Sequence, residues 1–455
     1  MTGASEPAAL RRGGSRTLGF WMCTALVVGN IIGIGIFAMP SSLAPYGLNA
    51  ITGWIVNVVG CALLALSFAA LSRAFPADDG PYQYTMRAFG RGTAFIVMWS
   101  YWVSTCVGDA AIAIGVVGYV AVFVPALART AGLSGLVAQA MIWTFVLVNL
   151  LGARTAGWVQ IVTTALKLLP QAAVIALGVW VLLAHPAFYS AHVPPNPFSW
   201  GEVNTVSAIA LFAMLGIECA MIPAGRVRDP ARTIPRATLA GTFVTGFIYI
   251  AISVVPIFLI PQKDLSASNA PYADLFARVL GGHYGDLIAL FVIVSGVGVL
   301  NGWTLIAGET AQAMGRHGGF PQVLSRENRS GAPAGALIFS GAVTSVLLLA
   351  NYSDSVQKVF TLLIVIATAA TLPLYFCSAL GLILLRRRGE LPAAAGSTTV
   401  MVVAAAAVIY CVWVAVGAGT EPLLWAVALC GAGLPLHLWS SAVRRRAGLL
   451  GSAAG

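Results

Sequence analysis

Long hydrophobic stretches alternate along this chain with short segments that hold most of its charged residues. A helix of about 20 apolar residues crosses the roughly 30 Å hydrocarbon core of a bilayer. On this criterion we expect an all-α integral membrane protein with twelve membrane-spanning helices. The predicted spans are residues 20–45, 50–73, 93–124, 133–152, 157–184, 203–224, 235–260, 284–314, 333–351, 356–385, 398–418 and 421–443.

The composition excludes a soluble globular protein. Hydrophobic residues make up 59% of the 455 positions and charged residues only 9%, whereas soluble domains carry about 25% charged residues. Lipid must therefore cover much of the surface. The basic cluster at Arg11, Arg12 and Arg16 leads into an apolar segment without a small-residue cleavage site, so no cleaved signal peptide is expected.

The basic residues predict how the chain is oriented. With a cytoplasmic N-terminus, 20 of the 25 Lys and Arg residues fall in cytoplasmic segments, and only Arg129, Lys263, Arg278 and Lys358 fall in outer loops. This bias follows the positive-inside rule and favours a multi-pass protein of the cell membrane with both termini cytoplasmic. Because the charge is scattered over many short segments, it does not indicate a nucleic-acid partner.

The sequence gives no sign of an enzyme or a metal site. All seven cysteines lie inside predicted spans as small apolar residues, without a CxxC pair or a Cys/His cluster. Nucleophile elbows, phosphate loops and HExxH motifs do not occur. We therefore expect no catalytic residue, no metal and no cofactor.

Two spans carry similar, glycine-interrupted segments. Residues 33–40 read GIGIFAMP and residues 216–223 read GIECAMIP, and both end in proline. About five spans separate them, and an odd number of crossings reverses the direction through the membrane. Matching interrupted helices in inverted halves are typical of secondary transporters, with the binding site where they meet.

The interruption at Gly33 and Gly35 suggests what is bound there. A helix break leaves backbone N–H and C=O groups without partners, and in a membrane these must face protein or a wet cavity. Helix N-termini favour a carboxylate and freed carbonyls favour an ammonium, so the pair suits an α-amino acid. The alternative is that both glycines only allow close helix packing.

Three segments resemble the amino-acid/polyamine/organocation transporters, most closely their bacterial arginine/agmatine antiporters and the related cadaverine/lysine antiporters. They read GNIIGIGIFAMPSSLAPYG, FAMLGIECAMIPAGRVRDPARTIPRAT and NGWTLIAGETAQAMGRHGGFP. The resemblance implies a LeuT-like fold with two inverted five-helix repeats, two extra helices, breaks in helices 1 and 6, and a homodimer in many bacterial members. The expected parts are an N-terminal tail at 1–17, repeats at 18–184 and 203–388, helices 11 and 12 at 398–443, and a basic tail at 444–455.

The same resemblance implies a substrate site. Its carboxylate would lie at the backbone of Gly33, Ile34 and Gly35, and its amino group at the carbonyls of Ile31 and Leu215. The third span would line the site with Ser104, Thr105, Asp109 and Ile112, whose spacing places them on one helical face. Trp303 and Tyr101 would be gates, and Glu218 would sense protons. Phe212 stands where the arginine/agmatine antiporters have a tryptophan that stacks on the substrate.

Charged residues inside spans need a reason, because an ionised group at mid-bilayer costs about 2.5–3.5 kcal/mol even on the mild insertion scale. Asp109 would pair with a cationic substrate or with Lys167. Lys167 would take the place of a sodium ion or extend toward the interface. Glu218 would bind a proton or make a packing hydrogen bond, and Glu309 would cap a helix at the interface.

These observations predict a secondary transporter, with an amino acid or amine and the lipid bilayer as partners. We expect exchange of a cationic amino acid, arginine best, for its amine agmatine or another amino acid. The alternative is proton-coupled, sodium-independent import of neutral amino acids, which Ile34, Phe212 and Lys167 would fit. From another class, a channel or a membrane-embedded sensor is a further alternative. A channel would allow flux without a counter-substrate.

Overall fold

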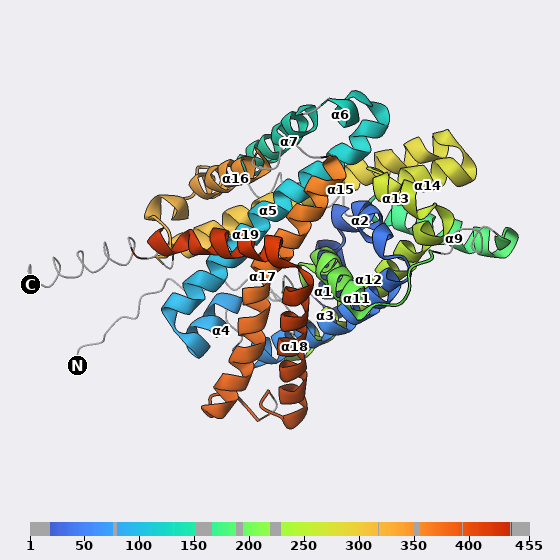
Figure 1. Ribbon diagram of the computed structural model, residues 1–455. Helices are drawn as coiled ribbons and strands as arrows, with labels where there is room; N and C mark the ends of the chain where they lie inside the picture. Colours follow the sequence, from blue (N-terminus) through green and yellow to red (C-terminus); the bar gives the residue numbers. More distant parts are fainter. Residues whose placement is uncertain are drawn as a thin grey trace, which may run out of the picture.

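All regular structure in the described part of the chain is helical (Figure 1). The computed structural model describes residues 19–75, 80–130, 132–151, 166–187, 194–218, 229–316, 318–349, 355–393, 395–436 and 438. The predicted tails at 1–17 and 444–455 lie outside these residues. An all-α protein was expected from the long apolar stretches, and the described residues agree with it.

Seven described helices are long and apolar enough to cross a membrane. They are α3 (Asn49–Ala74), α5 (Arg91–Phe123), α7 (Leu133–Leu150), α12 (Pro230–Leu259), α15 (Gly282–Arg316), α17 (Val356–Arg387) and α18 (Thr398–Gly417). An eighth span is formed by α1 (Phe20–Ile31) and α2 (Ile34–Leu43), which are bent relative to each other at a short break. The chain is thus a multi-pass membrane protein.

Four further predicted spans correspond to shorter helices. They contain α9 (Leu168–Ala184), α11 (Trp200–Leu211), α16 (Ala334–Leu349) and α19 (Thr420–Gly431). The start of the fifth span and the end of the sixth lie outside the described residues. The total of twelve spans and the two inverted repeats at 18–184 and 203–388 therefore remain predictions.

Short helices connect the spans, and the search for long apolar runs did not predict them. They are η1 (Ala44–Tyr46), α4 (Gly80–Phe89), α6 (Ala126–Arg129), α13 (Gln262–Ala267), α14 (Pro271–Leu280) and η5 (Gln322–Ser325); the 3₁₀ turn η2 (Phe212–Met214) instead follows α11 within the predicted sixth span. The connecting helix α14 buries Tyr272 and Leu275 against the bundle and exposes its other face. Such amphipathic segments are too short to register as spans.

Helix α5 lies at the centre of the bundle, packed against α15 and α17 (Figure 1). Every residue from 99 to 119 on it is buried, which is typical of a helix surrounded by others. In contrast, α18 exposes Val402, Ile409 and Val416, and such apolar side chains suit contact with lipid. The central position of α5 brings its middle turns next to the break between α1 and α2.

Candidate functional site

The first helix is interrupted where the glycine pattern predicted. α1 ends at Ile31, Ile32 is extended (φ −69°, ψ 109°), Gly33 is extended (φ −137°, ψ −174°), and α2 begins at Ile34. The two helical segments are bent by 48°. The N–H groups of the first turn of α2 have no partner inside their own helix, so this end can receive an anion.

Two side chains from other helices contact the end of α1. The Tyr249 hydroxyl on α12 donates a hydrogen bond to the Ile31 carbonyl at 2.9 Å. The Lys167 ammonium, at the start of α9 and 2% exposed, donates to the Gly29 carbonyl. Carbonyls freed near the break thus already have donors, although each carbonyl oxygen can accept a second hydrogen bond.

The second interruption follows α11 and has a different backbone geometry. After the 3₁₀ turn η2, Leu215 is extended (φ −61°, ψ 142°) and Gly216 has φ 106°. A side chain would strain that backbone, so glycine is the residue suited to it. Gly33, the corresponding glycine of the first segment, has an extended backbone instead, so the two matching glycines differ in conformation.

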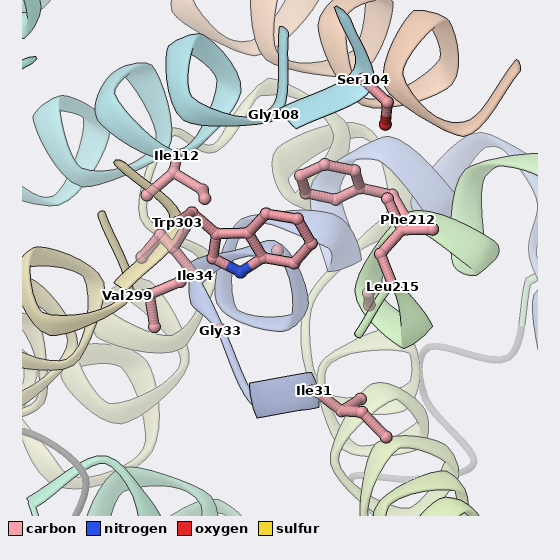
Figure 2. Close-up of a pocket in the computed structure, with 12 residues that line it drawn as sticks. Ile31, Gly33, Ile34, Ser104, Gly108, Ile112, Phe212, Leu215, Val299 and Trp303 are labelled. Atoms are coloured by element: carbon pink, nitrogen blue, oxygen red, sulfur yellow. The ribbon is translucent and has the colours of Figure 1, made fainter. Parts of the chain in front are cut away.

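A narrow cavity lies between the two breaks, where the space free of atoms is about 380 Å³ when its opening to solvent is included. Figure 2 shows the indole of Trp303 and the ring of Phe212 projecting into the middle of it. The lining comes from α1, α2, α5, the α11–η2 segment and α15: Ile31, Gly33, Ile34, Gly35, Ser104, Gly108, Ile112, Phe212, Ala213, Leu215, Val299 and Trp303.

Most of the predicted substrate contacts meet at this cavity, and two do not. Ser104, Gly108 and Ile112 follow each other at four-residue steps along α5 and line it. Thr105 and Asp109 each follow a lining residue, which turns them about 100° around the helix axis. Thr105 donates to the Trp102 carbonyl at 2.7 Å. Thr105 and Asp109 therefore do not line the cavity in this conformation, and their contact with substrate remains a prediction.

Asp109 is buried just behind the cavity, facing α15. It is 3% exposed, and its Oδ1 atom has no hydrogen-bond partner. Thr304, which follows Trp303 in the chain, supplies the nearby hydroxyl. The ion pair with Lys167 that we considered as an alternative is not formed, since the described ion pairs join other residues. Asp109 is thus a buried acid without a cationic partner next to the Trp303 turn.

Glu218 connects the second break to two central helices. Tyr101 on α5 donates to its Oε1 at 2.8 Å, and Tyr375 on α17 donates to its Oε2 at 2.8 Å. The Gly216 N–H also donates to Oε2, at 3.2 Å. The predicted gate residues Tyr101 and Glu218 therefore lie in one hydrogen-bonded cluster, away from the residues that line the cavity.

Sequence reasoning missed several members of this region. Gly108, Ala213 and Val299 line the cavity, and Tyr375 binds Glu218. Glycine, alanine and valine are ordinary in membrane helices, so their sequence carries no signal of a site. Tyr375 offered a weak one, because a buried tyrosine hydroxyl in an apolar span needs a partner.

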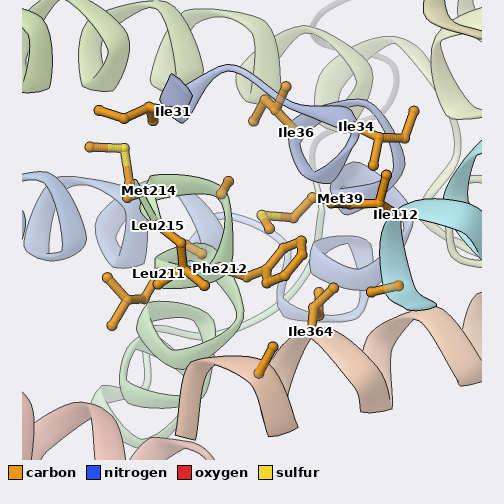
Figure 3. Packing of buried hydrophobic residues seen from close by; sticks show 14 of the residues in the cluster. Ile31, Ile34, Ile36, Met39, Ile112, Leu211, Phe212, Met214, Leu215 and Ile364 are labelled. Carbon is orange, nitrogen blue, oxygen red and sulfur yellow. The ribbon is translucent and has the colours of Figure 1, made fainter. Parts of the chain in front are cut away.

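The wall of the cavity is mostly apolar, as Figure 3 shows for the side chains that pack between the two breaks. Its one side-chain hydroxyl, that of Ser104, already donates to the Ala367 carbonyl at 2.8 Å and lies 2.5 Å from the Thr371 hydroxyl. Backbone groups at the breaks therefore supply the polar contacts. Among the described residues, no group of His, Cys, Asp and Glu could hold a metal ion.

Known proteins share this sequence over most of its length. The cadaverine/lysine antiporter of Escherichia coli (strain K12) is 30% identical over 388 residues, covering 81% of this chain and 84% of the relative. A Bacillus subtilis (strain 168) protein provisionally named an arginine/ornithine antiporter is 30% identical over 393 residues, covering 80% and 83%. The putrescine transporter PotE of Escherichia coli (strain K12) is 28% identical over 378 residues, covering 83% and 86%.

The family model described as amino acid permease matches residues 18–434, which include both helix breaks and every residue that lines the cavity. This match confirms the resemblance drawn from the three motifs, and it identifies a transporter and not an enzyme. The chain belongs to the amino acid permease family of membrane transporters.

Proposed function

We propose that this protein exchanges a cationic amino acid for its amine or for another amino acid. The observation that carries the proposal is the cavity between two interrupted helices, with the buried, cation-free carboxyl of Asp109 directly behind its wall. Backbone groups at the breaks suit the α-amino acid moiety, and Asp109 suits a positive side chain. The relatives named for cadaverine, lysine, putrescine, arginine and ornithine support the same class of solute.

The backbone of the first break would hold the substrate carboxylate. Gly33, Ile34 and Gly35 line the cavity at the N-terminus of α2, where the helix dipole favours negative charge. The substrate ammonium would then lie near the carbonyls of Ile31 and Leu215. Since Tyr249 already donates to the Ile31 carbonyl, the ammonium would use the second lone pair of that oxygen or displace the tyrosine.

A cationic side chain would reach Asp109 past the Trp303 turn. In this conformation Asp109 is outside the lining, and its carboxyl faces the Thr304 hydroxyl of α15. A small rotation of α5 against α15, or a rotamer change of Asp109, would bring the carboxyl to the cavity wall. Trp303 would cover the bound cation and stack on it, which is worth roughly 0.5–2 kcal/mol.

Two polar contacts would control the opening of the site. The bonds from Tyr101 and Tyr375 to Glu218 hold α5, α17 and the second break together, so their rupture would release that end of the cavity. Lys167 would hold the inner half of α1 at Gly29, as a bound cation would. We further propose the LeuT-like arrangement, the homodimer and the cytoplasmic position of both termini that the sequence predicted.

Within this class, arginine for agmatine is the pair that the sequence favours. The named relatives handle other cationic amino acids and amines, so lysine, ornithine, cadaverine and putrescine are the competing substrates. Import of neutral amino acids is the weaker alternative, because each of these relatives is named for a cationic solute. Ile34 and Phe212 remain the residues that the neutral alternative would use.

Exchange in proteoliposomes tests the proposal. Vesicles are loaded with arginine, agmatine, lysine, cadaverine, putrescine, alanine or methionine, and uptake of labelled arginine is followed. We expect rapid uptake only into vesicles that contain a cationic counter-substrate, with empty vesicles as the control. Equal uptake into empty vesicles would indicate a channel. Uptake of neutral amino acids driven by a pH gradient would instead support the alternative.

A further inference from the structure

A second, larger cavity lies at the end of the bundle where α2 and η1 meet α17 and the α18–α19 turn. It encloses about 910 Å³, including its open mouth. Its lining is rich in hydroxyl and amide groups: Ser41, Ser42, Tyr46, Thr205, Ser266, Gln357, Lys358 and Thr361, beside Pro45, Ile209, Leu362, Val365, Gly417, Ala418 and Pro422. None of these residues lines the cavity at the helix breaks.

The electrostatics of this second cavity favour an anion. Gln357 and Lys358 lie in the first turn of α17, a helix of 32 residues, and Pro422 lies in the first turn of α19. The N-terminal turns of two helices therefore border one space, and in α17 the Ser355 hydroxyl already accepts a hydrogen bond from the Lys358 N–H at 3.4 Å. The Lys358 ammonium is exposed and forms none of the described ion pairs. Glu421, beside Pro422, is the acidic residue in the first turn of α19, and it is exposed to solvent.

The cavity wall also contains a hydroxyl without a partner. Ser41 is 2% exposed, and its Oγ forms no hydrogen bond. A serine in a helix usually donates to the carbonyl four residues earlier. For Ser41 that is Phe37, whose carbonyl instead accepts a hydrogen bond from the Tyr119 hydroxyl at 2.6 Å. A buried, unpaired hydroxyl is unfavourable, so a ligand that accepts its hydrogen bond would be stabilised.

Neighbouring polar groups are already arranged around this point. The Ser42 and Thr361 hydroxyls lie 2.8 Å apart, and the Gln357 side-chain amide donates to Ser42 at 2.8 Å. These contacts join α2 to α17. Gly417 brings α18 close to α11, because a Cβ there would lie 2.1 Å from the Asn204 Oδ1 atom. The wall is therefore held from several helices and is not a gap between loose ends.

We propose that this second cavity binds an amino acid through its carboxylate, with Lys358 and the Ser41 hydroxyl as the contacts. The identity of the ligand rests on the proposed function, which makes amino acids the solutes of this protein. The binding of an anion rests only on the cavity, the helix ends and the lysine. A bound carboxylate would bridge Ser41 on α2 and Lys358 on α17, and so would couple occupancy of this site to the position of α2.

Counting bound ligands tests the proposal. Labelled arginine and labelled agmatine are dialysed to equilibrium against the purified full-length protein in neutral detergent. Arginine has a carboxylate and agmatine has none. We expect a tight and a weak equivalent of arginine, but only one equivalent of agmatine. Lys358→Gln is expected to weaken the second arginine equivalent at least tenfold, and Ser41→Ala to weaken it by a smaller factor.

Lys263→Gln is the matched control, since Lys263 is an exposed lysine of α13 that does not line the cavity. It should keep both arginine equivalents. If Lys358→Gln binds arginine as the wild type does, the second site is wrong while the proposed transport function stands. If only the tight equivalent is missing in the wild type, the transport proposal fails and the second site stands. Displacement of the weak equivalent by phosphatidylglycerol but not by alanine would assign the cavity to a lipid headgroup and overturn the proposal.

Discussion

At the scale of single residues, we propose that Asp109 decides the substrate class. We expect Asp109→Asn to bind arginine and lysine about tenfold more weakly, or about 1.4 kcal/mol, because their cationic side chains lose a buried counter-charge. Alanine and methionine should bind almost as before. Competition by these four ligands measures the effect. Glu309→Gln, which neutralises an exposed acid on α15, is the control. A uniform loss across all four ligands would show that Asp109 only supports the structure.

Trp303 is the second residue with a defined expectation. Its indole projects into the cavity beside Phe212 (Figure 2), so Trp303→Leu removes both a lid and a stacking surface. We expect weaker binding by a factor that corresponds to roughly 0.5–2 kcal/mol, at unchanged expression and monodispersity. Substrate affinity and exchange rate are measured together. Kinetics equal to those of the wild type would mean that the ring is ordinary packing.

The sequence predicted which residues lie near the cavity better than it predicted which side chains point into it. The motif residues at the breaks, together with Phe212 and Trp303, do meet at one cavity. Asp109 and Thr105 lie outside the lining because each follows a lining residue on α5 by one position, which is about 100° of rotation around the helix axis. Which stripe faces the cavity depends on how α5 packs against α15 and α17. That packing is a long-range property that spacing along one helix does not contain.

At the scale of elements, the second break depends on one glycine. Gly216 has φ 106°, and an L-residue in the left-handed region costs about 1–2 kcal/mol. We expect Gly216→Ala to lower the apparent Tm in detergent and to disturb the hydrogen bond from its N–H to Glu218. Gly92→Ala is the control, because Gly92 is helical on α5 with open space at its Cβ. Equal Tm values for the two variants would contradict this explanation.

The spans themselves illustrate what apolar length can and cannot predict. α3, α5 and α17 begin and end within two residues of their predicted bounds. The connecting helices α4 and α14 were missed, since each is ten residues long and amphipathic. The similarity of residues 33–40 and 216–223 predicted the interruption at Gly33 correctly, and α11 and η2 end just before the second segment, of which the structure describes only residues 216–218. The similarity did not predict that Gly33 would be extended and Gly216 would need a positive φ.

At the scale of the whole molecule, we expect transport without sodium. Lys167 contacts the Gly29 carbonyl near the break and is buried, and we propose that its fixed ammonium takes the place of a mobile cation. Initial exchange rates in sodium and in choline buffers should agree. A several-fold lower rate in choline would overturn the role given to Lys167. Vesicles without protein give the background leak in both buffers.

The contact between Lys167 and α1 also bears on electrical behaviour. The charge of Lys167 stays with the protein and is not carried across the membrane. It therefore cannot balance a difference in charge between the two substrates that are exchanged. Arginine has a net charge of +1 at neutral pH and agmatine +2, so their exchange moves one elementary charge, worth about 2.3 kcal/mol per 100 mV. Exchange of arginine for lysine or ornithine moves none. With the first pair the carrier would generate current and respond to membrane voltage, and with the second it would be electrically silent.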